Sequence, residues 1–143
     1  MARGVSGIGS YPLSLLWASI AASILGGMGI TYIEATVSNG DRSATLDFLI
    51  DSGAQLSLLP LDIWRRLGLE AIDSRQFRLA DGTLIERRVS ECKLTISEQS
   101  RHTPVILGEE GDEALLGVVT LEEFGLVLNP FARTLEPMRM RLT

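Results

Sequence analysis

The sequence has few of the residues that most often carry metal or nucleophilic chemistry. Cys92 is its one cysteine and His102 its one histidine. A single cysteine excludes an intrachain disulfide and a cysteine-based metal cluster, and Cys92, within an apolar alternation, is expected to be a small core residue. A Ser-His-Asp or Cys-His enzyme would have to use His102, which has no nucleophile motif nearby, so we expect a strand or turn residue there. We predict no metal and no cofactor.

The chain also lacks an excess of positive charge. Its 18 acidic and 13 basic residues give a formal charge of −5, and the basic residues are scattered along the sequence. This balance gives no electrostatic basis for binding nucleic acid. An apolar fraction of 45% in 143 residues is enough to build the core of one domain.

No long apolar run is present, although the first 27 residues carry only one charge, on Arg3. Residues 11–27 are apolar but rich in Ser, Ala and Gly, and they are short for a spanning helix, which needs about 20 apolar residues. Three interpretations stay open: a membrane anchor, a signal segment, or an extension upstream of a start at Met28. We favour a soluble, cytoplasmic mature protein over one anchored in a membrane by residues 11–27.

The most informative stretch joins a strand pattern to a tight turn. Residues 44–50 alternate and then run apolar, which predicts a strand that enters a core. Asp51 follows at the end of this strand, where a carboxylate is costly to desolvate unless it is hydrogen-bonded or functional. Ser52 adds a hydroxyl, and Gly53 permits a close backbone reversal. Asp-Ser-Gly alone is typical of an ordinary turn, so its context has to decide.

The rest of the chain predicts short strands with little helix. Asn39-Gly40 and Asp81-Gly82 are hairpin signals. Leu61, Ile63, Trp64 and Leu67 give a short helix an apolar face, and Gly68 ends it. We expect Thr120 to cap a helical turn over residues 121–124. The strands are expected at residues 30–38, 43–50, 75–79, 83–89, 91–97, 103–107, 114–117, 126–128 and 134–136.

This order resembles that of the retropepsin-like aspartic proteases, in particular the small single-domain bacterial and archaeal members. The similarity is carried by Asp51-Ser52-Gly53-Ala54, the apolar segment ending at Pro60, and Leu115-Leu116-Gly117. It implies a mainly all-β fold, a closed β-barrel with one or two short helices. The protease domain would span residues 28–137, between the apolar extension 1–27 and a polar tail at 138–143.

The resemblance also implies roles for individual residues. Asp51 would be catalytic, and Ser52 would brace two such loops through its hydroxyl. Gly53 would allow the close approach of the two carboxyl groups, and Ala54 would help line the site. Asp81 and Gly82 would lie near the tip of a flap that closes over a peptide, although a plain solvent-exposed hairpin is an equal alternative. In the second half of the pattern, Leu115 and Leu116 would pack behind the active-site loop, followed by Gly117.

The sequence contains one such Asp motif, whereas this chemistry needs two carboxylates that share a proton. We therefore predict a homodimer that joins Asp51 from two copies and cleaves a peptide or protein substrate. Two alternatives remain open at this point. The chain is a catalytically inactive binding or dimerisation module with the same fold, or a small β-barrel ligand binder in which Asp51 is only a turn residue.

Overall fold

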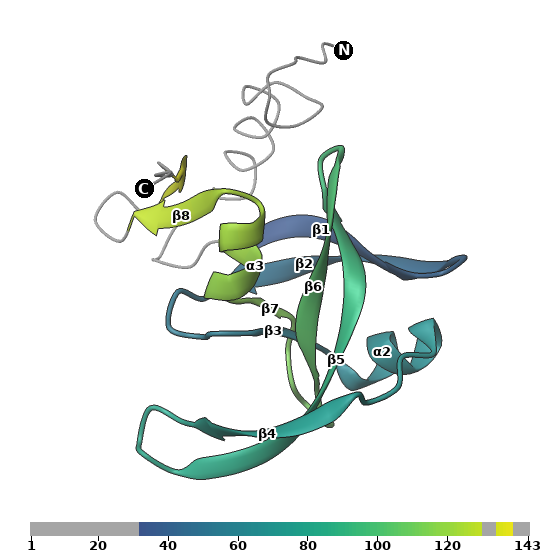
Figure 1. Cartoon of the computed structure of the whole chain (residues 1–143), viewed down its shortest axis with the longest axis vertical. Coiled ribbons are helices and arrows are strands. Elements are labelled where there is room, and N and C mark those ends of the chain that lie inside the picture. Colours follow the sequence, from purple (N-terminus) through teal and green to yellow (C-terminus); the bar gives the residue numbers. More distant parts are fainter. Residues whose placement is uncertain (1–31, 130–133, 139–143) are drawn as a thin grey trace.

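The computed structural model describes residues 32–129 and 134–138, which form nine strands and two short helices (Figure 1). The prediction of a mainly β fold is confirmed. In chain order the elements are β1 (Tyr32–Asn39), β2 (Arg42–Ile50), β3 (Ser57–Leu59), α2 (Leu61–Leu67), β4 (Asp73–Arg78), β5 (Leu84–Ile96), β6 (Gln99–Leu107), β7 (Leu115–Leu116), α3 (Val118–Glu123), β8 (Leu126–Asn129) and β9 (Thr134–Pro137).

The chain enters the fold through the hairpin of β1 and β2, paired from Tyr32↔Leu49 to Asn39↔Arg42. Its turn is at Gly40, whose φ of 64° suits glycine. Alternate residues of β1 (Ile33, Ala35 and Val37) are buried, as expected for a strand with one face on a core.

A seven-stranded sheet with the order β1-β2-β7-β3-β6-β5-β4 makes up most of the structure. The two-residue strand β7 lies between β2, to which it is parallel, and β3, to which it is antiparallel. Residues 36–38 of β1 also pair with residues 93–95 of β5, so the hydrogen-bonded order β1-β2-β7-β3-β6-β5 returns to β1. The second half of the chain thereby places β7 beside the strand that ends at Asp51.

The core fills the space enclosed by these strands and is covered by the two helices. Its largest fully buried side chains include Phe48, Leu94, Ile96, Leu107 and Leu116. Helix α2 adds Ile63, Trp64 and Leu67 and ends at Gly68 in the left-handed conformation, as the sequence predicts. The Trp64 indole N–H donates to the Gly108 carbonyl oxygen at 2.8 Å, which satisfies its one buried polar group.

Several predicted boundaries differ from the structure. The two strands predicted around Ser90 are one continuous strand, β5, whose outer half pairs with β4 as a projecting arm (Figure 1). Thr120 does not cap a helix, because α3 begins at Val118, directly after Gly117, and Thr120 lies inside it. The last strand, β9, extends one residue past the predicted 134–136 to include Pro137, and the Met138 N–H that follows donates to Gly125 O.

The predictions for residues 1–27 lie outside the described residues. Among the described helices, neither is long and apolar enough to cross a membrane.

Candidate active site

The loop after β2 fixes Asp51 through the protein backbone. The Asp51 N–H donates to Leu116 O at 3.0 Å, which joins the strand end to β7. The Gly53 N–H donates to Asp51 Oδ1 at 2.9 Å, and the Ala54 N–H donates to Asp51 O at 3.1 Å. The side chain of Asp51 is half-buried. One carboxylate oxygen thus accepts a hydrogen bond from a backbone amide of its own loop, which restricts the orientation of the Asp51 carboxylate.

The start of α3 clamps this loop from the other side. The Val118 N–H donates to Ala54 O at 2.8 Å, and the Val119 N–H donates to Gln55 O at 3.0 Å. These N–H groups belong to the first turn of α3, so they have no partner within the helix. The loop carbonyls take the place of a capping side chain, and the second half of the fold is tied to the loop of Asp51.

Gly117 permits this contact. A Cβ atom at residue 117 would lie 2.6 Å from Leu56 C and O and 2.9 Å from Ala54 O. These are backbone atoms that cannot move aside as the end of a side chain could. The φ of Gly117 is −97°, so glycine is needed here for space and not for conformation.

Leu115 and Leu116 face opposite sides of β7. Leu116 is fully buried in the core, behind the loop of Asp51. Leu115 is half-buried and is paired with Leu49 of β2 and Leu58 of β3, which are half-buried as well. The three residues form a row of partly exposed leucines across the adjacent strands β2, β7 and β3. Leu49 places this row two residues before Asp51. We call this set the leucine row.

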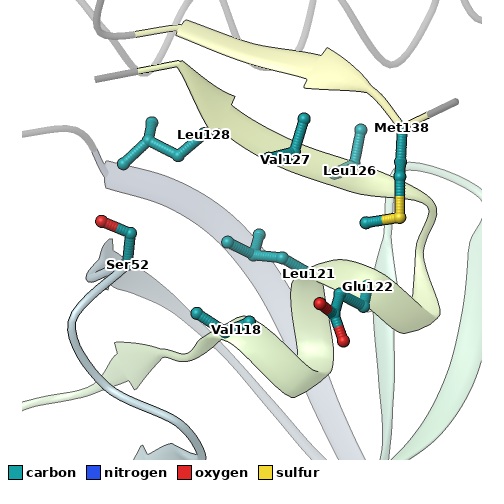
Figure 2. Close-up of a pocket in the computed structure, with 8 residues that line it drawn as sticks. All are labelled: Ser52, Val118, Leu121, Glu122, Leu126, Val127, Leu128 and Met138. Carbon is teal, nitrogen blue, oxygen red and sulfur yellow. The ribbon is translucent and has the colours of Figure 1, made fainter.

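Ser52 is exposed and lies at one end of an apolar cavity of about 80 Å³ between α3 and β8 (Figure 2). The figure shows Leu121 and Leu128 beside it, with Val127 and Met138 further along the cavity. The complete lining is Ser52, Val118, Leu121, Glu122, Leu126, Val127, Leu128 and Met138. Six of the eight lining residues are apolar, so the cavity suits an apolar side chain.

Asp81 and Gly82 form the exposed tip of the β4–β5 arm. The Thr83 N–H donates to Asp81 Oδ1 at 2.9 Å, and Gly82 has a φ of 89°. The Thr83 hydroxyl and then its N–H stabilise the carboxylate, which lowers the pKa of Asp81 from its usual value. These two residues lie in the turn that joins β4 to β5, and the hydrogen bonds that hold Asp51 come from other residues, Gly53, Ala54 and Leu116.

The other residues singled out in the sequence take structural positions. Cys92 is buried in β5, and burial, followed by the charge of Glu91, raises the pKa of its thiol to about 12, so it is no nucleophile at neutral pH. His102 is exposed on β6. Within residues 32–129 and 134–138, no group of three or more His, Cys, Asp or Glu side chains is arranged to hold a metal ion.

An apolar strand that ends in Asp-Ser-Gly, clamped by an apolar-apolar-Gly element from the second half of the chain, defines an aspartic-protease type of site. The sequence model of the aspartyl protease family matches residues 33–119, more than half of the chain. The chain therefore belongs to the aspartyl protease family.

Two solved protease structures are among those similar to the chain. The simian foamy virus protease is 16% identical over 64% of this chain and 92% of its own, with a TM-score of 0.49. A retropepsin-like aspartic protease from Rickettsia conorii is 22% identical over 65% of this chain and 69% of its own, with a TM-score of 0.47. No curated protein matches the chain.

Proposed function

We propose that the protein is an aspartic endopeptidase whose two catalytic carboxylates are Asp51 from two copies of the chain. The observation that carries this proposal is the way Asp51 is held. It is half-buried at a strand end and oriented by the Gly53 N–H, and its loop is clamped by α3. A turn aspartate with no further role would not need a clamp built from residues more than 60 positions away.

The chemistry follows from two carboxyl groups that share one proton, since two like charges close together cannot both ionise. The ionised Asp51 removes a proton from a water molecule as the water oxygen attacks the peptide carbonyl carbon. The protonated Asp51 of the other copy gives its proton to the carbonyl oxygen. When the tetrahedral intermediate breaks its C–N bond, a proton passes to the leaving nitrogen, which departs as an amine.

The dimer brings the faces that carry Asp51 together around a two-fold axis. An isologous contact uses the same surface on both copies. Ser52, next to Asp51, lies at one end of the apolar cavity, and Val127, which lines the cavity further along, is an exposed apolar side chain on β8. Strands β8 and β9 form a two-stranded sheet of their own, with unpaired edges among the described strands. We assign this surface, namely the cavity with β8, to the second copy.

The substrate is an extended peptide with apolar side chains beside the bond that is cut. The leucine row adjoins Asp51 and offers a partly exposed apolar surface. Phe77 of the arm packs, together with Leu58, against Leu56, Val89 and Ile106, which connects the arm to the same surface. We assign the arm, with Asp81 and Gly82 at its tip, to closure over the bound peptide.

The test is peptide-library cleavage by the full chain beside the variants Asp51→Asn and Asp47→Asn. Asp47 is the matched control, because it is an exposed aspartate on the same strand. Losing an acid and a base should lower the cleavage rate by at least about a thousand-fold in Asp51→Asn, with dimerisation retained in the same samples. Asp47→Asn should cleave as the wild type does.

Two results would contradict the proposal. Normal cleavage by Asp51→Asn would exclude Asp51 as the catalytic group. A wild-type protein that dimerises but cleaves no peptide of the library would favour the inactive dimerisation module.

A further inference from the structure

Behind the loop of Asp51 lies a chain of three buried hydroxyl groups from three separate elements. Ser57 Oγ of β3 lies 2.6 Å from Thr120 Oγ1 of α3, and Thr120 Oγ1 lies 2.7 Å from Thr103 Oγ1 of β6. Their exposed fractions are 0% for Ser57, 0% for Thr120 and 1% for Thr103. At Ser57 this series of hydroxyl groups is joined to the backbone, because the Gly117 N–H donates to Ser57 Oγ at 3.0 Å. We call Ser57, Thr120 and Thr103 the hydroxyl chain.

Thr120 is the residue on which this chain depends. Each hydroxyl has one proton to donate and two lone pairs to accept with. Ser57 Oγ accepts from the Gly117 N–H, and among the described residues Thr120 is the side-chain partner of both Ser57 and Thr103. Removal of the Thr120 hydroxyl would therefore leave two buried hydroxyls short of a partner, which costs far more than losing an exposed hydrogen bond.

The hydroxyl chain fixes α3 against the sheet. Strands β3 and β6 are already paired with each other, from Ser57↔Val105 to Leu59↔Leu107. Helix α3 has no strand ladder to set its position. Its polar connections to the sheet include the Thr120 hydroxyl and the Gly117 N–H, which both lead to Ser57. Directional hydrogen bonds to β3, the strand that follows the loop of Asp51, therefore fix the position of α3.

The position of α3 in turn decides the position of the loop. Val118 and Val119, one and two residues before Thr120, donate to Ala54 O and Gln55 O. Those carbonyls belong to the loop whose Gly53 N–H orients Asp51 Oδ1. A shift of α3 would therefore move the loop through these two hydrogen bonds, and the loop would move the Asp51 carboxylate with it.

We propose that the hydroxyl chain is a positioning device for the reaction, with Thr120 as its central positioning residue. It sets the direction in which each copy presents Asp51 to the other. This inference rests on the proposed function, and it assigns to Thr120 a role beyond filling the core. In a dyad built from two separate chains, any error in the loop is present twice.

The experiment compares Thr120→Val with Thr120→Ser in the full chain. Valine keeps the shape of threonine and removes the hydroxyl, whereas serine keeps the hydroxyl and removes the methyl group. Misplacing a reacting group by a fraction of an ångström to 1 Å costs up to about a hundred-fold in rate. We expect kcat of Thr120→Val to fall on the order of 10- to 100-fold, with KM changed by less than about twofold. Thr120→Ser should recover most of kcat.

A control variant and the conditions of measurement separate an effect on positioning from a general loss of stability. Thr45→Val removes a hydroxyl from the exposed Thr36–Thr45 pair on β1 and β2, which has a similar 2.7 Å contact, and should leave kcat unchanged. All rates are measured at enzyme concentrations well above the dimer dissociation constant. The temperature is chosen so that the fluorescence of each variant shows it to be folded. The pH profile of kcat is recorded as well, because a displaced dyad changes how strongly its two carboxyl groups interact.

Amide hydrogen exchange at Gly53, Ala54 and Val118 provides a readout that does not need cleavage. We expect faster exchange at these three amides in Thr120→Val and not in Thr120→Ser or Thr45→Val. If Thr120→Val does not fold, Thr103→Val, at the far end of the hydroxyl chain, replaces it with the same expectations in smaller measure.

The inference is overturned if the hydroxyl-deficient variant is only less stable, with wild-type kcat, pH profile and amide exchange. It also fails if Thr120→Ser is as slow as Thr120→Val, since the methyl group would then matter and not the hydroxyl. Absence of Asp51-dependent cleavage in the wild type would instead count against the proposed function, while the exchange measurement would still decide whether the hydroxyl chain holds the loop.

Discussion

At the scale of single residues, Cys92 shows how burial links ionisation to stability. Its side chain is buried in β5, and burial raises the pKa of the thiol from 9.0 to about 12. Between these two pH values the unfolded chain has lost the thiol proton and the folded chain has kept it. Because the unfolded state then binds fewer protons, the free energy of unfolding falls as pH rises through this window.

We therefore expect the stability advantage of the wild type over Cys92→Ala to shrink at alkaline pH. At pH 7 the variant should be less stable, because a buried sulfur is lost. By pH 10.5 the difference should have decreased on the order of 1–2 kcal/mol, since one pKa unit corresponds to about 1.4 kcal/mol. Urea unfolding of both proteins at pH 7, 9 and 10.5 measures this, and the comparison cancels the other titrating groups. A difference that stays constant from pH 7 to 10.5 would contradict the prediction.

Single residues also mark where sequence reasoning stops. The Asp51-Ser52-Gly53 turn and Gly117 could be singled out because each follows an apolar strand pattern within a few residues. Thr120 was assigned to a helix cap, as a threonine before an apolar turn normally is. Its actual partners, Ser57 and Thr103, are 63 and 17 residues away. No local pattern encodes such a contact, so the hydroxyl chain could be found only from the three-dimensional arrangement.

At the scale of elements, the β4–β5 arm depends on its base. The Ser90 hydroxyl donates to Glu70 O at 2.7 Å, and the Ile72 N–H donates to Val89 O at 2.8 Å. These two bonds join the segment before β4 to β5 at the point where the arm leaves the sheet. Ser90 is only 4% exposed, so its hydroxyl cannot exchange this partner for bulk water.

We expect Ser90→Ala to loosen the arm while the rest of the sheet stays intact. The loss of one buried hydrogen bond should lower the free energy of unfolding by about 1 kcal/mol. Hydrogen exchange should become faster at Ile72 and along the β4–β5 pairs, and stay unchanged at the β1–β2 pairs. Thr45→Ala, which removes an exposed hydroxyl of β2, is the control. Equal exchange along the arm in wild type and Ser90→Ala would show that the arm is held by other contacts.

The elements differ in how far they could be predicted. The β1–β2 hairpin, α2 and the Asp81-Gly82 turn follow from short-range signals: turn glycines, apolar spacing and a helix-ending glycine. The break predicted near Ser90 was wrong because an alternating strand continues unless glycine or proline interrupts it, and residues 84–96 contain neither. The insertion of β7 between β2 and β3 pairs residues more than 50 positions apart, and local spacing carries no information on that order.

At the scale of the whole molecule, one chain offers half of the proposed catalytic dyad. The surface assigned to the second copy consists of the cavity beside Ser52 and of β8. It is apolar where it adjoins Asp51, and Val127 on β8 is 44% exposed. A large apolar side chain at the centre of an isologous contact acts twice, once in each copy. Its replacement by a charge should thus weaken association strongly with little effect on the folded monomer.

The decisive comparison is Val127→Lys against Ile72→Lys. Ile72, in the segment before β4, is 67% exposed. Like Val127 it is a β-branched apolar residue at the surface, but it lies outside the surface assigned to the second copy. We expect Val127→Lys to raise the dimer dissociation constant at least about ten-fold, because two lysines would have to be desolvated at one interface. Ile72→Lys should leave it unchanged. Sedimentation velocity over a dilution series gives the constants, and cleavage measured on the same dilutions should fall in parallel with the dimer fraction. Full activity of a Val127→Lys protein that sediments as a monomer would show that one copy suffices, and equal weakening by both variants would place the contact on another surface.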